Sequence, residues 1–157
     1  RDDEADAAKP KLHLVYFDTL GRVETKAAGT GYHYAHVYLV PSRNWLWVNG
    51  TKTIESSELL SSVQSDVNKL EKRFGCKLER MHVDCLATTR GKEFIAWFNA
   101  ALIDRRLSPP GQHAYLGDLE RYMWTLFVSA LIALRFGEAP ASMWYEALVG
   151  AVDCENI

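Results

Sequence analysis

The sequence predicts one α/β domain, in which three strands come first and most of the helices follow. Its 157 residues, 48% of them hydrophobic and 24% charged, suit a single globular core. The first third holds apolar runs rich in β-branched and aromatic residues, whereas apolar residues recur at helical spacing in most of the remainder. Residues 1–10 are polar and end in proline, so we expect a flexible lead-in before a domain over residues 11–157.

Three β-prone runs, separated by turns that contain glycine or proline, predict the opening strands. They cover residues 11–19, 32–40 and 45–48. Because strands joined by short turns usually pair as antiparallel neighbours, we expect a three-stranded meander. Asn49 and Gly50, directly after the third run, predict a hairpin turn.

Helical periodicity from residue 53 predicts a helix that ends at Phe74, where Gly75 supplies the stop signal. A short strand is expected next, over residues 77–83. Three further helices are predicted over residues 91–102, 117–136 and 140–151. The Ser-Pro-Pro-Gly segment at residues 108–111 breaks the chain before the longest of them.

Charge and cysteine content narrow the class of protein. The formal net charge of −2 counts against strong DNA binding by this domain alone, because phosphate neutralisation supplies much of that affinity. Cys76, Cys85 and Cys154 are an odd number at wide spacing, so we expect free thiols in an intracellular reducing compartment. No apolar run has the length of a membrane span. The chain begins with Arg1, which is compatible with a targeting segment that has been removed.

Three carboxylates occupy positions that suggest metal binding. Asp18 and Asp84 each follow an apolar run, and 35 residues separate Asp84 from Glu120 in the first turns of the long helix. A carboxylate at the end of a buried strand is costly unless it is hydrogen-bonded or binds a cation. Three such side chains can hold two Mg²⁺ or Mn²⁺ ions for phosphoryl transfer. Spacing alone leaves another interpretation open, with turn-capping aspartates and a glutamate favoured by the helix dipole.

Six segments, taken in order, carry a resemblance to one family. They are HLVYFDTLG, YHYAHVYLVPSRNWLWV, FGCKLERMHVDC, GKEF, SPPGQHAYLGDLER and EAPASMWYEAL. Together they resemble the integrase catalytic core of copia-type retrotransposons, from about residue 11 to the C-terminus. The resemblance implies a ribonuclease H-like fold, with a mixed sheet of about five strands, the first three antiparallel, flanked by helices. It also places Asp18, Asp84 and Glu120 at catalytic, metal-binding positions, with Mg²⁺ or Mn²⁺ as cofactor and DNA as partner.

Weaker candidates flank the three carboxylates. Arg90 and Lys92 near the second aspartate, and Arg121 beside Glu120, are candidate contacts to DNA phosphates, although Arg90 and Lys92 also fit a solvated helix start. His33 and His36 lie three residues apart, and such positions on a strand face opposite sides. We therefore expect structural roles for both histidines and no shared metal.

The long helix departs from the family pattern. Apolar residues stand where the family places basic and polar side chains that face DNA. These residues are Tyr122, Met123, Trp124, Val128 and Leu131. A small domain leaves one face of such a helix exposed, so the five side chains predict a protein interface. The alternative is that they fold back into their own core.

Two functions are therefore carried forward. The first is a polynucleotidyl transferase that processes DNA 3′ ends and joins them to target DNA with two metal ions. The second is a repurposed, non-catalytic integrase fold, whose long helix binds a protein partner or a second copy of the chain. The second is motivated by the acidic charge, by Cys85 where the family has Asn-Gly, and by the absence of the zinc-binding and basic C-terminal modules of a full integrase. On that evidence we expect either an excised core or the loss of the flanking modules.

Overall fold

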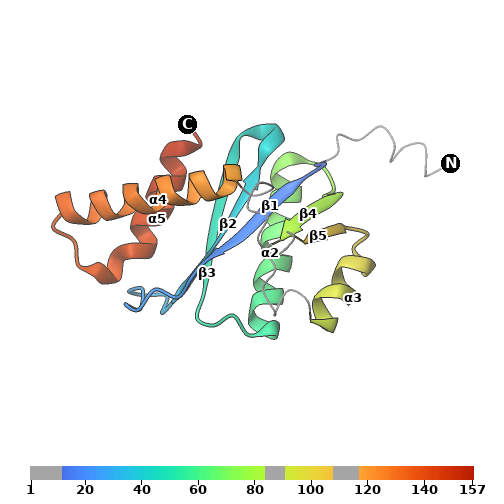
Figure 1. Ribbon diagram of the computed structural model, residues 1–157, viewed down its shortest axis with the longest axis horizontal. Coiled ribbons are helices and arrows are strands. Elements are labelled where there is room, and N and C mark those ends of the chain that lie inside the picture. The colour runs from blue at the N-terminus through green and yellow to red at the C-terminus, as the bar shows by residue number, and fades with distance from the viewer. Residues whose placement is uncertain (1–11, 84–90, 108–116) are drawn as a thin grey trace.

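The computed structural model describes residues 12–83, 91–107 and 117–157, with the rest drawn in grey in Figure 1. Of the predicted features, the lead-in at 1–10, the break at 108–111, Asp84, Cys85 and Arg90 lie outside these residues. The described strands are β1 (Val15–Leu20), β2 (Tyr34–Val40), β3 (Trp45–Thr51), β4 (Arg80–Val83) and β5 (Asp104–Leu107).

These strands form one sheet in the order β3-β2-β1-β4-β5. β1, β2 and β3 are antiparallel neighbours, whereas β4 runs parallel to β1 and β5 parallel to β4. The predicted mixed sheet of five strands, with the first three antiparallel, is thereby confirmed. The helices are α2 (Ser56–Phe74), α3 (Lys92–Ala100), α4 (Gly117–Phe136) and α5 (Trp144–Glu155), with 3-10 turns η1 (Pro41–Arg43) and η4 (Ala141–Met143).

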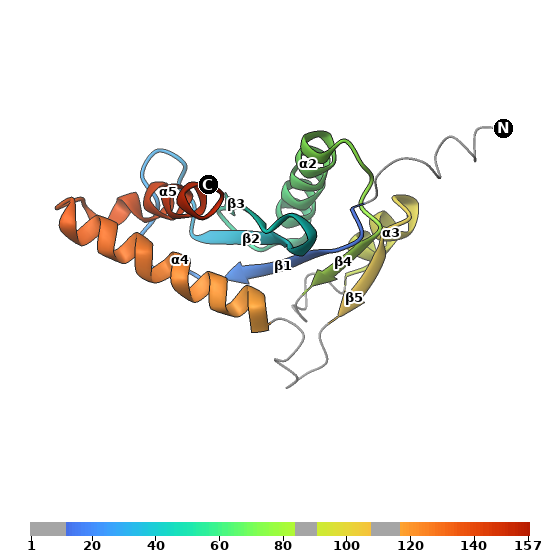
Figure 2. The same cartoon turned by 90° about the horizontal axis from the view of Figure 1, so that it is seen from above.

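The helices cover the sheet in two pairs, which Figures 1 and 2 show from two directions. Alternate residues of each strand point to opposite faces, so the sheet supplies side chains to two separate cores. Phe17 and Tyr38 pack with α2 and α3 in one core. Val37 and Leu39 pack with α4 and α5 in the other. Asp18, which lies in a described strand, can therefore be assigned to a face from its strand register.

Asp66 lies in the first of these cores, although it is charged and its side chain is fully buried. Its carboxylate accepts hydrogen bonds from Tyr38, Trp47 and Asn49, at 3.0 Å each, and Lys69 is 4.0 Å away. Burial raises the pKa of Asp66, while the three hydrogen bonds act to lower it. The bonds tie α2 to the two strands beneath it.

The predicted turn at Asn49 and Gly50 is wrong, because both residues lie inside β3. Asn49 turns its side chain to Asp66, and Gly50 leaves space for an aromatic ring. A Cβ on Gly50 would lie 2.3 Å from Cδ2 of Tyr32. The glycine is there to admit this ring and not to reverse the chain.

Two boundaries also differ from the sequence prediction. α2 begins at Ser56 and not at residue 53, because the Glu58 carboxylate accepts the backbone N–H groups of Lys52 and Thr53 and holds them outside the helix. β5 had no assigned position in the sequence. Its residues, Asp-Arg-Arg-Leu, are exposed or half-buried and lack an apolar alternation, so its pairing with β4 carries no local signal.

The chain end is fastened to the edge of the sheet. Oδ1 of Asn156 accepts the N–H of Leu46 at 2.8 Å, and its Nδ2 donates to the carbonyl of Leu46 at 2.7 Å. Leu46 lies in β3, an outermost strand. One amide side chain thus makes both bonds that an adjacent strand would make at this residue.

Candidate active site and flanking surfaces

Asp18 lies half-buried on β1, on the face covered by α4 and α5. Its Cα partner across the antiparallel pair is Val37, and directly paired residues share a face. Val37 is buried in the core beneath α4 and α5, which fixes the side on which Asp18 lies. Oδ1 of Asp18 accepts the N–H of Thr19 at 2.7 Å, which orients the carboxylate.

Glu120 belongs to α4, the helix that covers the same face of the sheet. It is exposed in the first turn of α4, directly after Leu119, which is fully buried in the core beneath that helix. Arg121 follows and is also exposed. Two of the three predicted carboxylates therefore lie on one face of the sheet, on a strand and on the helix that crosses it.

The third carboxylate, Asp84, lies outside the described residues. The last described residue of β4 is Val83, which pairs in parallel with Phe17, the residue before Asp18. One residue earlier, the ring of His82 stacks on that of Tyr16 with centroids 5.6 Å apart. Among the described residues, no three His, Cys, Asp or Glu side chains are grouped so that they could hold a metal ion. Asp18 and Glu120 supply the oxygen donors that Mg²⁺ and Mn²⁺ prefer.

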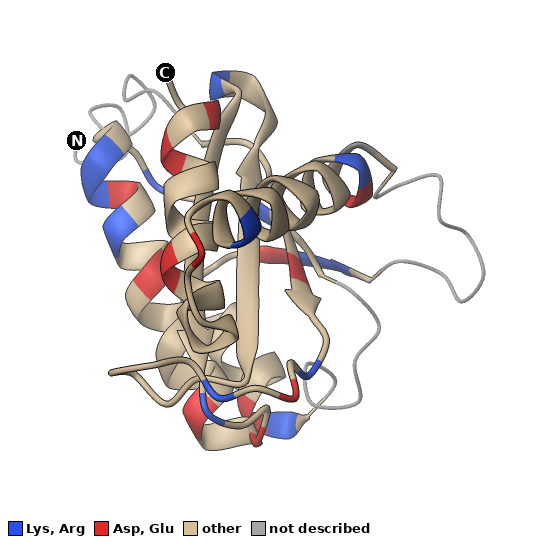
Figure 3. Cartoon of the chain, turned by 90° about the vertical axis from the view of Figure 1, so that its left-hand side faces the viewer, with Lys and Arg blue, Asp and Glu red and all other residues tan. Residues whose placement is uncertain are grey.

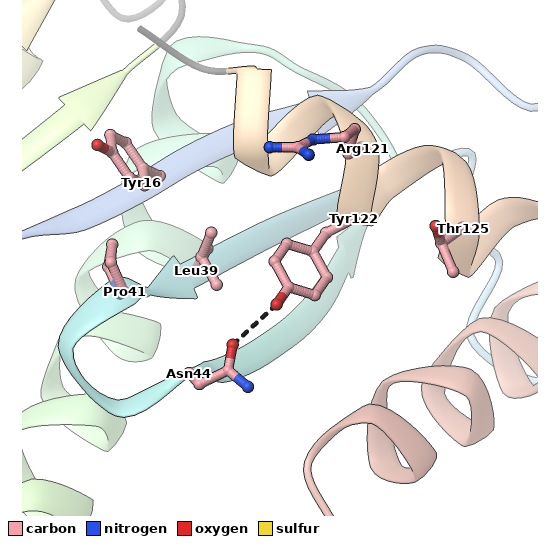
Figure 4. A pocket seen from close by; sticks show the side chains of 7 residues that line it. All are labelled: Tyr16, Leu39, Pro41, Asn44, Arg121, Tyr122 and Thr125. Carbon is pink, nitrogen blue, oxygen red and sulfur yellow. Dashed lines mark hydrogen bonds between the residues drawn. The ribbon is translucent and has the colours of Figure 1, made fainter.

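A pocket of about 430 Å³ lies between the sheet and the start of α4 (Figure 4). The hydroxyl of Tyr122 donates to Oδ1 of Asn44 at 2.8 Å across its floor. Asn44 has φ of 47°, a left-handed conformation that asparagine tolerates. The lining side chains combine one cation with aromatic, apolar and uncharged polar groups: Tyr16, Leu39, Pro41, Asn44, Arg121, Tyr122 and Thr125.

The sequence did not identify this pocket, because its parts come from β1, β2, the turn after β2 and α4. Pro41, Ser42 and Asn44 are a local signal for a turn, but the distant partner Tyr122 is not visible in it. Arg121 is the only residue predicted to bind DNA among those that line the pocket.

The other predicted DNA contacts are placed differently. Lys92 is the exposed first residue of α3, which packs on the opposite face of the sheet from α4. Lys92 and Arg121 therefore reach solvent from helices on opposite faces. Arg90 lies outside the described residues.

His36 is fully buried in β2, with its ring held between two threonines. Nδ1 lies 2.9 Å from Oγ1 of Thr19, and Nε2 lies 2.8 Å from Oγ1 of Thr51. Burial lowers the pKa of His36 to about 4, with a small opposing effect from Glu58. His33, which precedes the strand, hydrogen-bonds to the carbonyl of Val23. Both contacts fit structural roles.

The five predicted interface residues of α4 divide into two groups. Tyr122, Met123 and Val128 are half-buried, and the first two pack against the core beneath the helix. Trp124 and Leu131 are exposed, at 69% and 48% of their full accessible area. The sequence prediction did not include Ile132 and Phe136, which are exposed at 50% and 85%.

We call Trp124, Leu131, Ile132 and Phe136 the α4 stripe. The charged residues of α4 stand near its two ends, so the middle of the helix is uncharged (Figure 3). Even so, none of the helices in the described part of the chain is long and apolar enough to cross a membrane. Four large apolar side chains on one helix form the kind of surface that usually meets another protein.

Comparison with known proteins shows which solved structures share this fold. No protein-family model matches the sequence, and no curated protein matches it either. Among solved structures, the chain resembles one from the simian T-cell lymphotropic virus intasome in complex with the PP2A regulatory subunit B56 gamma. The TM-score is 0.70 at 19% identity, over 90% of this chain and 47% of the other. It also resembles the catalytic core domain of BIV integrase, with a TM-score of 0.63 at 14% identity, over 89% of this chain and 80% of the other.

These likenesses establish the fold class and nothing finer. The chain has the ribonuclease H-like fold of retroviral integrase catalytic cores. It spans about half the length of the intasome chain that it matches. Function must therefore be argued from the site itself.

Proposed function

We propose that this chain is an integrase-core polynucleotidyl transferase of the copia type, which processes DNA 3′ ends and joins them to target DNA. The observation that carries the proposal is the placement of Asp18 and Glu120 on one face of the sheet. The third member, Asp84, follows directly on Val83, whose backbone pairs with the neighbour of Asp18. The resemblance of the surrounding segments to the copia-type core supports the same assignment.

In this proposal, Asp18, Asp84 and Glu120 hold two Mg²⁺ or Mn²⁺ ions. Bound ions would supply charge stabilisation for phosphoryl transfer at this site. Arg121, beside Glu120 and exposed to the pocket of Figure 4, binds a DNA phosphate. Tyr16 lies on the same face as Asp18, two residues earlier on β1, and offers an aromatic ring to a nucleobase.

The test is a cleavage assay with branched DNA that mimics a strand-transfer product, in Mn²⁺. We expect the wild-type chain to resolve the branch, and Asp18→Asn, Asp84→Asn and Glu120→Gln each to lower the rate by at least about a hundredfold, as expected for the loss of metal-ion catalysis. Glu93→Gln, a change of an exposed helix-start glutamate, serves as the matched control and should retain activity. No cleavage, together with no rise in melting temperature on addition of Mn²⁺, would contradict the proposal.

A second candidate function rests on the α4 stripe. In this case the fold is non-catalytic and docks through α4 to another chain. Glu120 and Arg121 precede the stripe, whereas Arg135 and Glu138 lie at and beyond its other end. Two antiparallel copies of α4 can therefore bring opposite charges together at both ends, which favours a second copy of the chain as the occupant.

Light scattering distinguishes this candidate from the first. We expect a dimer for the wild type, and a monomer for the double variant Trp124→Ser, Leu131→Ser. Cys154→Ser, a change of an exposed residue on α5, is the control that should leave the mass unchanged. A monomeric wild type that cleaves branched DNA would reject the docking function and support the enzyme.

A further inference from the structure

A second cavity, of about 450 Å³, lies in the loop between β1 and β2. It shares no lining residue with the pocket beside Arg121. Its lining consists of two lysines and a run of small residues: Lys26, Ala27, Ala28, Gly29, Thr30, Gly31 and Lys52. No acidic side chain lines it, so both charges at the cavity are positive.

The two lysines converge over Gly31. Cε of Lys26 lies 2.9 Å, and Cε of Lys52 3.5 Å, from the point that a Cβ on Gly31 would occupy. Within the described residues, no carboxylate forms an ion pair with either ammonium group; Glu58 accepts the backbone N–H of Lys52 and attracts its charge only at longer range. Both lysines are exposed and approach the same point, so a bound anion there would meet two positive charges.

The loop backbone adds hydrogen-bond donors to this positive charge. Gly29 and Gly31 have φ of 75° and 76°, left-handed conformations of the kind that shape backbone amides into anion-binding hollows. The N–H groups of Thr30 and Gly31 donate within the loop, whereas in the described structure the N–H of Gly29 has no acceptor. The Thr30 hydroxyl accepts a hydrogen bond from the backbone N–H of Tyr32, at 3.3 Å, and its own proton can be donated to a ligand.

We propose that this cavity binds a phosphate group, held by Lys26, Lys52 and the N–H of Gly29. Ammonium groups and a backbone N–H form the charge-assisted hydrogen bonds that phosphate oxygens favour. The volume exceeds that of one phosphate, so the site accepts either the free ion or a phosphate that carries substituents. The phosphate comes either from free inorganic phosphate or from the backbone of a polynucleotide.

The first experiment is an NMR titration of the full chain with inorganic phosphate, at constant ionic strength set with chloride. We expect saturable shifts of the Gly29 and Gly31 amides, and a loss of affinity of at least about tenfold in Lys26→Gln, as expected for one lost charge-assisted hydrogen bond. Lys72→Gln makes the same charge change on the exposed side of α2 and should bind as the wild type does. Equal amide shifts on addition of chloride alone, or unchanged phosphate affinity in Lys26→Gln, would overturn the proposal.

A second variant tests the geometry without removing charge. Gly31→Ala places a Cβ against Lys26, so the affinity of this variant for phosphate should fall. The NMR spectrum of the variant must first show that it is folded. Unchanged affinity in folded Gly31→Ala would also count against the site. If Gly31→Ala does not fold, Lys52→Gln replaces it with the same expectation.

A measurement of duplex DNA binding identifies the source of the phosphate. If the site takes polynucleotide phosphate, Lys26→Gln weakens the binding of duplex DNA. It also lowers the slope of the logarithm of the binding constant against the logarithm of the salt concentration by about one unit. If duplex binding is unchanged while phosphate binding is lost, the ligand is the free ion. Neither result requires metal or cleavage, so this proposal can fail or succeed independently of the enzyme assay.

Discussion

The hydroxyl of Tyr38 donates a hydrogen bond to Oδ2 of Asp66 at 3.0 Å, and this contact joins the middle of the sheet to α2. Both side chains are completely buried. The indole of Trp47 and the amide of Asn49 donate to the same carboxylate, so three side chains from the sheet share one buried acceptor.

Tyr38→Phe removes one donor from this network without changing the volume of the core. We expect a loss of about 1 to 2 kcal/mol in the free energy of unfolding, since the carboxylate stays buried with one fewer donor. Urea denaturation measures it. Tyr34→Phe, which removes the hydroxyl of a half-buried tyrosine at the start of β2, should change stability by no more than about 0.5 kcal/mol.

His36 predicts a pH dependence of stability. Its pKa is about 4 in the folded chain, against an ordinary histidine value of 6.5, so the unfolded chain binds more protons between these values. Stability from this group is complete above pH 6.5 and is lost as the pH falls through that window, by about 3 kcal/mol between pH 7 and pH 4. Urea unfolding across this range should show a steeper decline for the wild type than for His36→Gln. If the free energy of unfolding falls equally with pH in both proteins, His36 does not control the pH dependence of stability.

Gly50→Ala should destabilise the chain, because its Cβ would lie 2.3 Å from the Tyr32 ring. That ring packs edge-on against Tyr145 of α5, with centroids 5.0 Å apart, so it cannot move without disturbing α5. We expect a loss of about 1 to 3 kcal/mol, the usual range for overpacking. Thermal unfolding provides the comparison, with Gly21→Ala as control, where an added Cβ has nothing within 4 Å.

Trp124 and Leu126 lie two residues apart on α4 but on different sides. Trp124→Ser should change the free energy of unfolding by no more than about 0.5 kcal/mol, because the side chain is exposed. Leu126→Ala should cost about 2 to 5 kcal/mol, because Leu126 is buried. Chemical denaturation of the monomer separates the two. A large loss in Trp124→Ser would mean that the ring stabilises the fold itself.

Much of this fold could be predicted from the sequence, since hydrophobic periodicity reports which residues face a core. The bounds of α4 were predicted correctly, and Gly75 ends α2 in the left-handed conformation expected of a helix stop. β5 could not be located, because a polar edge strand is defined by its backbone partner and not by its side chains. The turn assigned to Asn49 and Gly50 failed for a related reason, since the ring that needs the glycine is distant in sequence.

The candidate site divides in the same way. Asp18 and Glu120 were predicted from their positions and from the resemblance of the surrounding segments, and their places on a strand and a helix follow from local pattern. The pocket lined by Arg121 depends on the approach of Tyr122 to Asn44, 78 residues apart, which no local pattern encodes. The burial of Asp66 could have been predicted from the sequence, because an aspartate between Val63 and Leu70 falls on the buried side of an amphipathic helix.

The amide of Asn156 gives the last turn of the chain a protective function. An outermost strand with unpaired N–H and carbonyl groups is a template on which a foreign strand can add, and repeated addition leads to aggregation. By engaging both groups of Leu46, Asn156 closes that template at one residue of β3. Asn156 thereby protects the edge of the sheet at this residue, and its loss would leave both backbone groups of Leu46 open to pairing with another molecule.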